Sequence, residues 1–298
     1  MSTEQNQENI FSPRFDWNFR IGNQLIHLRE SLDKINNDIE ALDFGEMKFM
    51  PPLLAVHYAS LILESKTITN ISGRNSYLER IKFPQCLSSE NNNEWGQILG
   101  TYSSKTYLPI IKFSTSSLEE GSSIREALLN HVFGSIRSIA SLPTNYYSAI
   151  AYLLSELTNN IVEHSRHDFG YLSFQYYRDN QFMDICLADR GIGVLGSYQN
   201  YVGSRDFSHV TDHLTAVDSA VKGQSTKQIS ESRGYGIATS RTILTKGIGG
   251  TFVYLTGNAL LINEDLSNFG TEFKGSIVLI RIPIANFNPQ LNWIDFVE

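Results

Sequence analysis

Cysteine is scarce in this chain of 298 residues. The two cysteines, Cys86 and Cys186, have no closely spaced Cys or His partner, so the ligand spacing of a structural zinc site is missing. Both side chains are expected to be reduced thiols, with Cys186 buried in a strand. Reduced thiols are typical of a cytoplasmic protein, which is the location that the sequence predicts.

Long hydrophobic runs are also missing. The longest one, residues 51–63, is interrupted by His57 and Tyr58 and is too short to cross a bilayer. The first residues do not show the basic and then apolar pattern of a secretory signal. No membrane association is expected.

Positive charge is limited and dispersed. The formal net charge is −7, and the Lys and Arg residues form no dense block interleaved with aromatic residues. Direct binding to nucleic acid is therefore not expected. The phosphate-binding pattern G-x-x-x-x-G-K-[ST] is absent as well, so a nucleotide site would have to be of another kind.

A strong helical pattern runs from residue 147 to residue 164. Its apolar positions recur on one face and predict a core contact: Ile150, Leu154, Leu157 and Ile161. Glu156, Asn160 and His164 are spaced at i, i+4 and i+8, so they line up on a neighbouring face. An amide oxygen there could bind a hard divalent cation while the carboxylate activates a hydroxyl or water. Taken alone, the three residues could equally be the solvated side of an amphipathic helix.

Two glycine clusters follow. Segments 171–176 and 182–188 alternate apolar and polar residues and predict a hairpin, whose second strand leads into Asp189-Arg-Gly-Ile-Gly193. An aspartate there could accept a hydrogen bond from an exocyclic amine. The second cluster, Ser232-Arg-Gly-Tyr-Gly236, precedes a helical run over 237–244, where free amides would suit a phosphate. Either cluster alone could be an ordinary turn.

Taken in this order, these pieces over residues 120–290 resemble the GHKL superfamily of ATP-binding domains, which includes anti-sigma-factor kinases, histidine kinases and MutL-like ATPases. Glu156-Leu-Thr-Asn-Asn160 is similar to the first motif, Asp189–Gly193 to the first glycine box and Gly234-Tyr-Gly236 to the second. Gly270-Thr271, followed by a strand over 276–283, looks like the last motif.

The resemblance implies a role for each matched residue. Glu156 would be the catalytic residue and Asn160 would hold Mg²⁺, while Asp189 would bind the adenine amino group. Gly191 and Gly193 would leave room for the ring. The further binding residues that it implies are His164, Gly234, Tyr235, Gly236 and Thr271.

Residues 195–233 are polar and mostly irregular, which is typical of a lid over a binding site. Within the lid, Ser225-Thr-Lys227 resembles the T-S-K element of MutL-like lids. Lys227 or Lys222 is expected to reach the terminal phosphate, with Arg233 as a lesser candidate. His209 and His213 are four residues apart, but no third metal ligand is nearby, so two solvated histidines are expected.

The first half of the chain is predicted to form a smaller α/β domain. A polar tail over residues 1–15 precedes a strand at 16–21, a helix at 24–42, and a helix at 53–63 that begins after Pro51-Pro52. The buried strand Leu42-Asp-Phe44 before that last helix is similar to the central element of STAS domains. This weaker resemblance covers residues 16–115.

In regulated STAS domains a phosphorylatable hydroxyl residue begins the helix, whereas Met50-Pro-Pro52 stands at that place here. The resemblance therefore implies a docking or dimerisation surface instead of a phosphate acceptor.

The predicted fold class is α+β: a GHKL-type two-layer α/β sandwich over residues 120–298, preceded by the STAS-like α/β domain. The boundary is placed in the Ser/Glu/Gly-rich connector 114–123, after a strand at 107–113 and an exposed loop at 85–96. Ser122 or Ser123 would cap the next helix, over 124–139.

The leading functional hypothesis is a Mg-ATP-binding regulatory protein that hydrolyses ATP slowly or uses ATP as a conformational switch. The first alternative is a protein serine/threonine kinase of the anti-sigma-factor type, in which Glu156 would activate a partner's hydroxyl. The second is a non-catalytic ATP-responsive scaffold. The expected cofactors are ATP and Mg²⁺, and the expected partners are a protein bound through the N-terminal domain and, on ATP binding, a second copy of the chain.

Overall fold

The computed structural model describes residues 10–14, 19–35, 39–73, 75–88, 94–224, 226, 236–285 and 287–297. Helices and strands are both abundant and the strands form mixed sheets, so the fold class is α+β, as predicted. Among the described residues, no helix combines the length and the apolar character needed to span a membrane.

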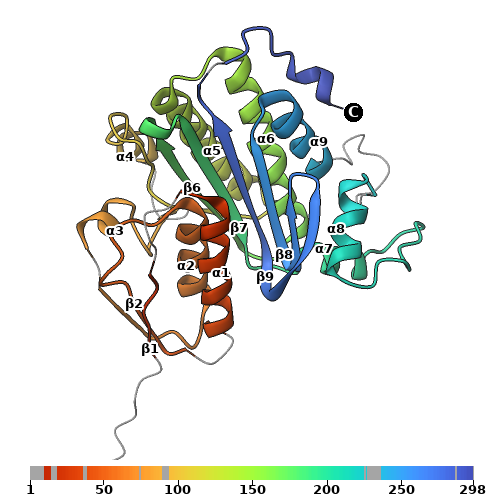
Figure 1. Ribbon diagram of the computed structural model, residues 1–298, viewed down its shortest axis with the longest axis horizontal. Coiled ribbons are helices and arrows are strands. Elements are labelled where there is room, and N and C mark those ends of the chain that lie inside the picture. Colours follow the sequence, from red (N-terminus) through yellow and green to blue (C-terminus); the bar gives the residue numbers. More distant parts are fainter. Residues whose placement is uncertain are drawn as a thin grey trace, which may run out of the picture.

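A six-stranded sheet forms the centre of the molecule (Figure 1). Its order is β4-β5-β6-β7-β9-β8, with antiparallel neighbours except for the parallel pair β4 and β5. The strands are β4 (Leu87–Ser88), β5 (Ile111–Ser114), β6 (Phe169–Tyr177), β7 (Phe182–Asp189), β8 (Thr251–Ile262) and β9 (Asp265–Pro283). The predicted hairpin is confirmed as β6 and β7, which are joined by a 3₁₀ turn at Arg178–Asn180.

Both faces of β7 are buried, and residue parity decides which helices each side chain meets. Met183, Ile185 and Leu187 belong to one core cluster, whereas Cys186 and Ala188 belong to another. Both thiols of the chain, Cys86 and Cys186, are free and buried.

The first core cluster lies between the sheet and a layer of helices near the C-terminal part of the chain. That layer contains α5 (Glu119–Ala140), α6 (Thr144–His164), α9 (Gly236–Thr242) and the π-helix η2 (Ile243–Ile248). The predicted apolar face of α6 is confirmed, since Ile150, Leu154, Leu157 and Ile161 are all buried in this cluster. Sheet and helices form two layers on this side of the molecule.

The second core cluster lies on the opposite face of the same sheet, where α1 (Ile21–Ile35) and α2 (Pro52–Glu64) pack (Figure 1). These two helices also connect a small parallel sheet of order β1-β2-β3, formed by β1 (Ile10–Phe11), β2 (Ala41–Asp43) and β3 (Asn70–Ser72). The large sheet is therefore covered by helices on both faces. The arrangement has three layers, with α5, α6, α9 and η2 on one face and α1 and α2 on the other.

The predicted boundary at 114–123 does not coincide with a break in the structure. β5 ends at Ser114 and pairs with β6 from Ile111 to Ser114, so strands on both sides of the boundary share one sheet. The loop predicted at 85–96 contains the buried strand β4. Both predictions fail because strands pair with segments that are distant in the sequence, and the local composition of a segment does not indicate its partner.

Several N-terminal expectations are confirmed and others are wrong. β2 ends at Asp43, and α2 begins at Pro52 after Pro51, as predicted. The predicted tail 1–15 is wrong at Ile10 and Phe11, which pair with β2, while residues 1–9 and 15 lie outside the described residues. Of the strand predicted at 16–21, residues 16–18 lie outside the description, and Ile21 begins a helix instead.

The predicted start of α5 is also wrong. The helix begins at Glu119 with Leu118 at the N-cap, so Ser122 and Ser123 lie within it and cap nothing. Two acidic residues, Glu119 and Glu120, occupy the first turn, where carboxylates interact favourably with the helix dipole. Two short helices, α3 (Ser76–Arg80) and α4 (Trp95–Gly100), precede it, and the 3₁₀ helix η3 (Trp293–Phe296) lies near the end of the chain.

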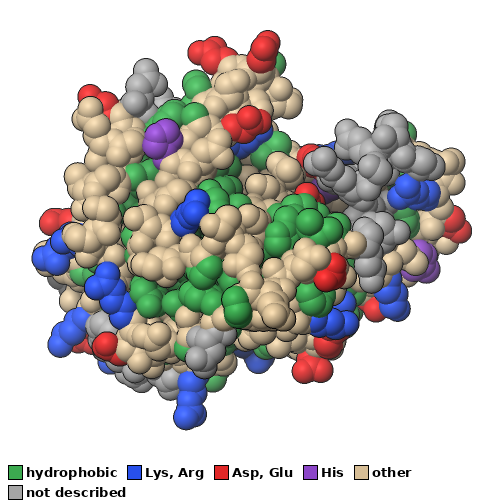
Figure 2. All heavy atoms as spheres, turned by 90° about the horizontal axis from the view of Figure 1, so that it is seen from above, with side chains coloured by type: hydrophobic (Ala, Val, Ile, Leu, Met, Phe, Trp, Pro, Cys, Tyr) green, Lys and Arg blue, Asp and Glu red, His purple; other side chains and the backbone are tan. Residues whose placement is uncertain are grey.

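The predicted lid contains two helices, α7 (Gly193–Gln199) and α8 (His213–Val221). Asp212 caps α8 in a capping box with Thr215, which explains why a helix forms in this polar stretch. On the face seen in Figure 2, hydrophobic side chains gather near the middle, while Lys and Arg are interleaved with Asp and Glu around the edge.

Candidate functional site

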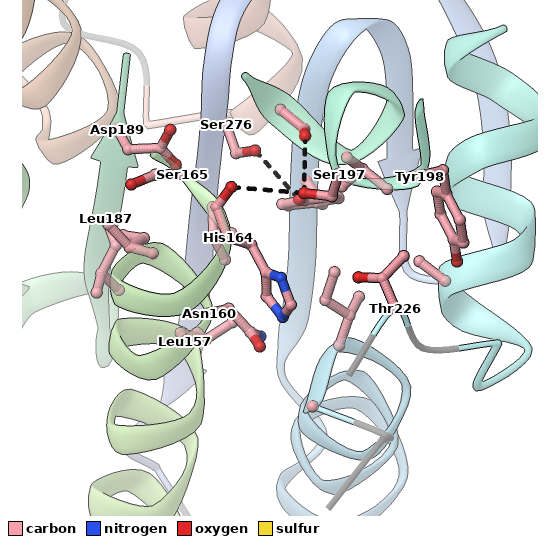
Figure 3. Close-up of a pocket in the computed structure, with 18 of the residues that line it drawn as sticks. Leu157, Asn160, His164, Ser165, Leu187, Asp189, Ser197, Tyr198, Thr226 and Ser276 are labelled. Atoms are coloured by element: carbon pink, nitrogen blue, oxygen red, sulfur yellow. Dashed lines mark hydrogen bonds between the residues drawn. The ribbon is translucent and has the colours of Figure 1, made fainter. Parts of the chain in front are cut away.

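A pocket opens between α6, the end of β7 with the middle of β9 beside it, and the helices of the lid (Figure 3). Six of the sequence-predicted site residues line it: Asn160, His164, Asp189, Gly193, Thr226 and Gly236. Its other lining residues include apolar side chains of the sheet and helices, such as Leu157, Leu187, Tyr254 and Val278. Residues as far apart in the sequence as Leu157 and Val278 therefore converge on one concave surface.

The α6 side of the pocket carries the amide and the imidazole. In Figure 3, Asn160 and His164 point from the helix into the pocket. The Asn160 Nδ2 atom is buried and has no hydrogen-bond partner among the described residues. Burying an unpaired amide donor costs free energy, so this atom marks a position where a ligand would be stabilised.

Glu156 lies one turn before Asn160 and is only 7% exposed. It does not line the pocket, but it faces the start of α9. A Cβ atom at Gly236 would lie 3.0 Å from both amide atoms of Asn160 and 3.3 Å from Glu156 Oε2. The glycine at this position lets the beginning of α9 approach the two polar side chains closely.

Asp189 ends β7 at the other end of the pocket, beside Ser165 (Figure 3). Its side chain is 3% exposed, and its Oδ1 accepts a hydrogen bond of 2.8 Å from the Gly191 amide. Burial raises the pKa of Asp189 to about 6, although the Gly191 hydrogen bond and His167 act in the opposite direction. The carboxylate is thus held in place but is easily neutralised near neutral pH.

The two glycines after Asp189 serve the packing of the loop itself. A Cβ atom at Gly191 would lie 1.9 Å from the Ser165 carbonyl oxygen. Gly193 has φ +65°, and a Cβ atom there would lie 2.6 Å from Thr256 Oγ1. The glycines therefore admit neighbouring protein groups, and the expectation that they also leave room for a ring stays a prediction. Of the two, Gly193 also lines the pocket.

A hydroxyl group at the pocket was missed by the sequence interpretation. Ser276 of β9 lines the pocket and accepts a hydrogen bond of 3.2 Å from the Tyr254 hydroxyl. Ser276 in turn donates to Thr256 Oγ1 over 3.3 Å. The available signal was the pair Gly275-Ser276 at the very start of the predicted strand.

The predicted Thr271 is not among the residues that line the pocket. It lies on β9 five residues before Ser276, and the pairing with β8 shifts its register between the two residues. The structure therefore does not bring Thr271 together with the other predicted residues at the pocket.

The predicted lid residues have different outcomes. Thr226 lines the pocket, but the exposed Lys222 pairs with Asp218 over 2.6 Å and is not part of the lining. Ser225, Lys227, Arg233, Gly234 and Tyr235 lie outside the described residues. None of the described lining residues is Lys or Arg. A cation for a phosphate would have to come from elsewhere in the chain or from a metal ion.

The described residues contain no group of three or more His, Cys, Asp and Glu side chains that could hold a metal ion by themselves. His209 approaches Gln224 and Ser219, and His213 faces Glu272, so the two histidines do not form a pair. A Mg²⁺ ion that is shared between Asn160 and a phosphate needs no such cluster. The amide of Asn160 fits that requirement.

Comparisons of the chain with protein-family models, with curated proteins and with solved structures gave no match.

Proposed function

We propose that this pocket binds an adenine nucleotide together with Mg²⁺, and that the protein is a regulatory switch which hydrolyses ATP slowly. The observation that carries the proposal is the convergence of Asn160 and Asp189 on one pocket. The buried Asn160 Nδ2 atom, which no described residue bonds, supports a ligand at one end, and the buried carboxylate of Asp189 supports an amine-bearing base at the other.

Each side chain would have a role that follows from its position in the pocket. Asp189 would accept a hydrogen bond from the adenine amino group, and the apolar wall of Leu157, Leu187 and Val278 would pack on the ring. The Asn160 amide oxygen would hold Mg²⁺, which when bound would neutralise charge on the phosphates. Glu156, one turn away, would orient or deprotonate the attacking hydroxyl or water.

The GHKL resemblance agrees with this assignment in the identity and order of the residues. The proposal also includes a cytoplasmic location, a protein partner for the N-terminal part of the chain and an ATP-dependent homodimer.

The test begins with the purified full chain, Mg²⁺ and ATP labelled at the terminal phosphate. Binding is measured by calorimetry, and free phosphate and phosphoprotein are followed over time. Slow release of free phosphate is the expected result. Transfer of label to a protein hydroxyl would identify the kinase alternative, and binding without turnover would identify the scaffold. Absence of Mg-ATP binding would overturn the proposal.

Glu156→Gln decides whether this carboxylate acts as a base. The variant keeps the size and hydrogen bonding of the side chain, so ATP should still bind, whereas phosphate release should fall by about 10²–10⁴-fold. Glu126→Gln on the exposed side of α5, away from the pocket, is the matched control and should leave turnover near the wild-type value. Equal turnover in both variants would make Glu156 a structural residue.

A further inference from the structure

Asp189 and Arg190 are consecutive residues whose side chains serve opposite faces of the sheet. Asp189 shares its parity with Leu187 and lines the pocket on the α6 side. Arg190 shares its parity with Cys186 and Ala188, which face α1 and α2. Any movement of the Arg190 backbone therefore changes the position of the residue that is proposed to bind the base.

Arg190 is buried and bonded to α2, not to a carboxylate. Its Nε donates to Ser60 Oγ over 2.9 Å, and its Nη2 donates to the His57 carbonyl over 2.8 Å. Nη2 also lies 3.0 Å from His57 Nδ1, and the guanidinium stacks on the Phe273 ring with 4.5 Å between Cζ and the ring centroid. Burial lowers the pKa of Arg190 to about 10, which leaves the guanidinium charged at neutral pH.

The state of His57 follows from these contacts. An arginine only donates hydrogen bonds, so His57 Nδ1 must accept, and the proton of the neutral imidazole must reside on Nε2. His57 Nε2 then donates to Ser31 Oγ of α1, which is 2.8 Å away. Burial and the nearby Arg190 charge both lower the pKa of His57, in agreement with a neutral ring. The network thus joins the pocket loop to two helices.

The same loop is clamped from its other side. The Ile192 amide donates to the Ser165 carbonyl at the end of α6 over 2.9 Å, and Gly191 packs directly against that carbonyl. On the other face, the loop is held to α2 by the Arg190 hydrogen bonds to Ser60 and His57. Residues 189–192 are therefore held between α6 and α2.

A buried charge of this kind is weak support for a purely stabilising role. Its desolvation cost offsets much of what the hydrogen bonds contribute, and a well-packed apolar residue often stabilises a core equally well. The charged network fixes the orientation of the Arg190 side chain, because its three hydrogen bonds are directional, whereas the contacts of an apolar side chain are not.

We propose that Arg190 and His57 are positioning residues of the nucleotide pocket: by anchoring the loop 189–193 to α2, they hold Asp189 in the orientation that binds the base. This inference rests on the proposed function. It makes the layer of α1 and α2 part of the nucleotide site, although none of its residues lines the pocket.

The test compares three substitutions in α2 of the full chain. His57→Leu removes the acceptor for Arg190, and His57→Asn restores an acceptor close to the position of Nδ1. Val56→Ala is the control, since it removes buried volume from the same helix and leaves the hydrogen-bonding side chains in place. Two quantities are measured: the affinity for ATP, and the hydrogen exchange of the Gly191 amide in the nucleotide-free protein.

His57→Leu should weaken ATP binding by about tenfold, a typical size for coupling between groups that do not touch the ligand. It should also expose the Gly191 amide to exchange, because that amide donates to Asp189. His57→Asn should recover most of both values, and Val56→Ala should change neither. Wild-type affinity and protection in His57→Leu would overturn the inference, as would equal losses in Val56→Ala.

The two proposals fail in different ways. If the wild-type chain binds no ATP, the proposed function falls, while the exchange of the Gly191 amide still decides the positioning role. Faster exchange in His57→Leu alone would support that role, and unchanged exchange would remove it.

Discussion

Asn160 and Asp189 differ in the hydrogen bonding of their side chains in the ligand-free pocket. The Asn160 Nδ2 atom is buried, and none of the described residues accepts a hydrogen bond from it. Asp189 is already bonded to the Gly191 amide, but burial raises its pKa to about 6. A phosphate oxygen that accepts from Nδ2 would relieve the first cost, and an amine that donates to the carboxylate would relieve the second.

Asn160→Ala should impair binding of Mg-ATP more than binding of adenosine, because it removes a metal ligand and leaves the base-binding end intact. Titration of each ligand by calorimetry gives the two affinities. Asn159→Ala is the matched control, since this neighbouring asparagine is exposed and does not line the pocket. Equal loss for ATP and adenosine would point to a folding defect, and no loss would remove Asn160 from the site.

The pKa of Asp189, about 6, predicts a pH dependence for base binding. As the pH falls through about 6, the carboxylate is protonated and the affinity for adenosine should decrease. Stability should change in the opposite sense: the folded-state pKa is raised, so the ligand-free protein binds more protons than the unfolded chain and should be stabilised over the same fall. Calorimetric titration with adenosine, which has no phosphate to titrate, and thermal melts measure the two effects.

Asp189→Asn is the control for both effects, because an amide does not titrate. In this variant the pH dependence around 6 should disappear from binding and from stability. A wild-type adenosine affinity that stays constant from pH 5 to pH 8 would contradict the proposed role of Asp189.

At the scale of elements, the site depends on how closely α6, α7 and α9 approach the strand ends. Gly236 admits the start of α9 to the polar face of α6, and Gly193 begins α7 in a left-handed conformation. Tyr198 of α7 donates to the Gln224 carbonyl, so α7 is tied to the segment after α8.

Two glycine substitutions should act in opposite directions. Gly193→Ala should destabilise the protein by about 1–3 kcal/mol and weaken ATP binding, since φ is +65° and a Cβ atom would lie 2.6 Å from Thr256 Oγ1. Gly134→Ala in the middle of α5 should stabilise by about 0.5–1 kcal/mol, because a Cβ atom there meets nothing within 4 Å. Chemical denaturation measures both. A neutral Gly193→Ala would show that α7 can move without cost.

At the scale of the whole molecule, one sheet carries two cores. Its C-terminal helical layer supplies the pocket, while α1 and α2 bury the other face, including Cys186, Val253 and Leu279. Arg190 and the α2 contacts connect the two sides. The N-terminal part is consequently part of the same folding unit as the pocket.

A fragment of residues 115–298, cut at the boundary that composition suggests, should fail to fold on its own. The cut removes β4, β5 and both helices that cover the second face, and exposes a large apolar surface. Circular dichroism melts and binding of a hydrophobic dye measure the outcome. A chain lacking only residues 1–9 keeps every described element and serves as the control. A monomeric fragment that melts cooperatively and binds ATP would contradict this account.

The sequence by itself determined the elements whose cause is local. The apolar spacing of residues 150–161 defined the buried face of α6, and alternation defined the hairpin of β6 and β7. The same helical spacing placed Asn160 beside His164, and the position at a strand end placed Asp189 at the edge of the sheet. Local backbone geometry fixes each of these relations.

Only the tertiary structure decided which distant segments meet. It brought Ser276 to the pocket and left Thr271 outside, because position along a strand depends on the register with β7 and β8. It joined β5 to β6 across the predicted boundary, and bonded Arg190 to His57, which lies 133 residues earlier in the chain. Such contacts depend on side-chain packing across the two faces of one sheet, and no periodicity within a segment encodes its partner.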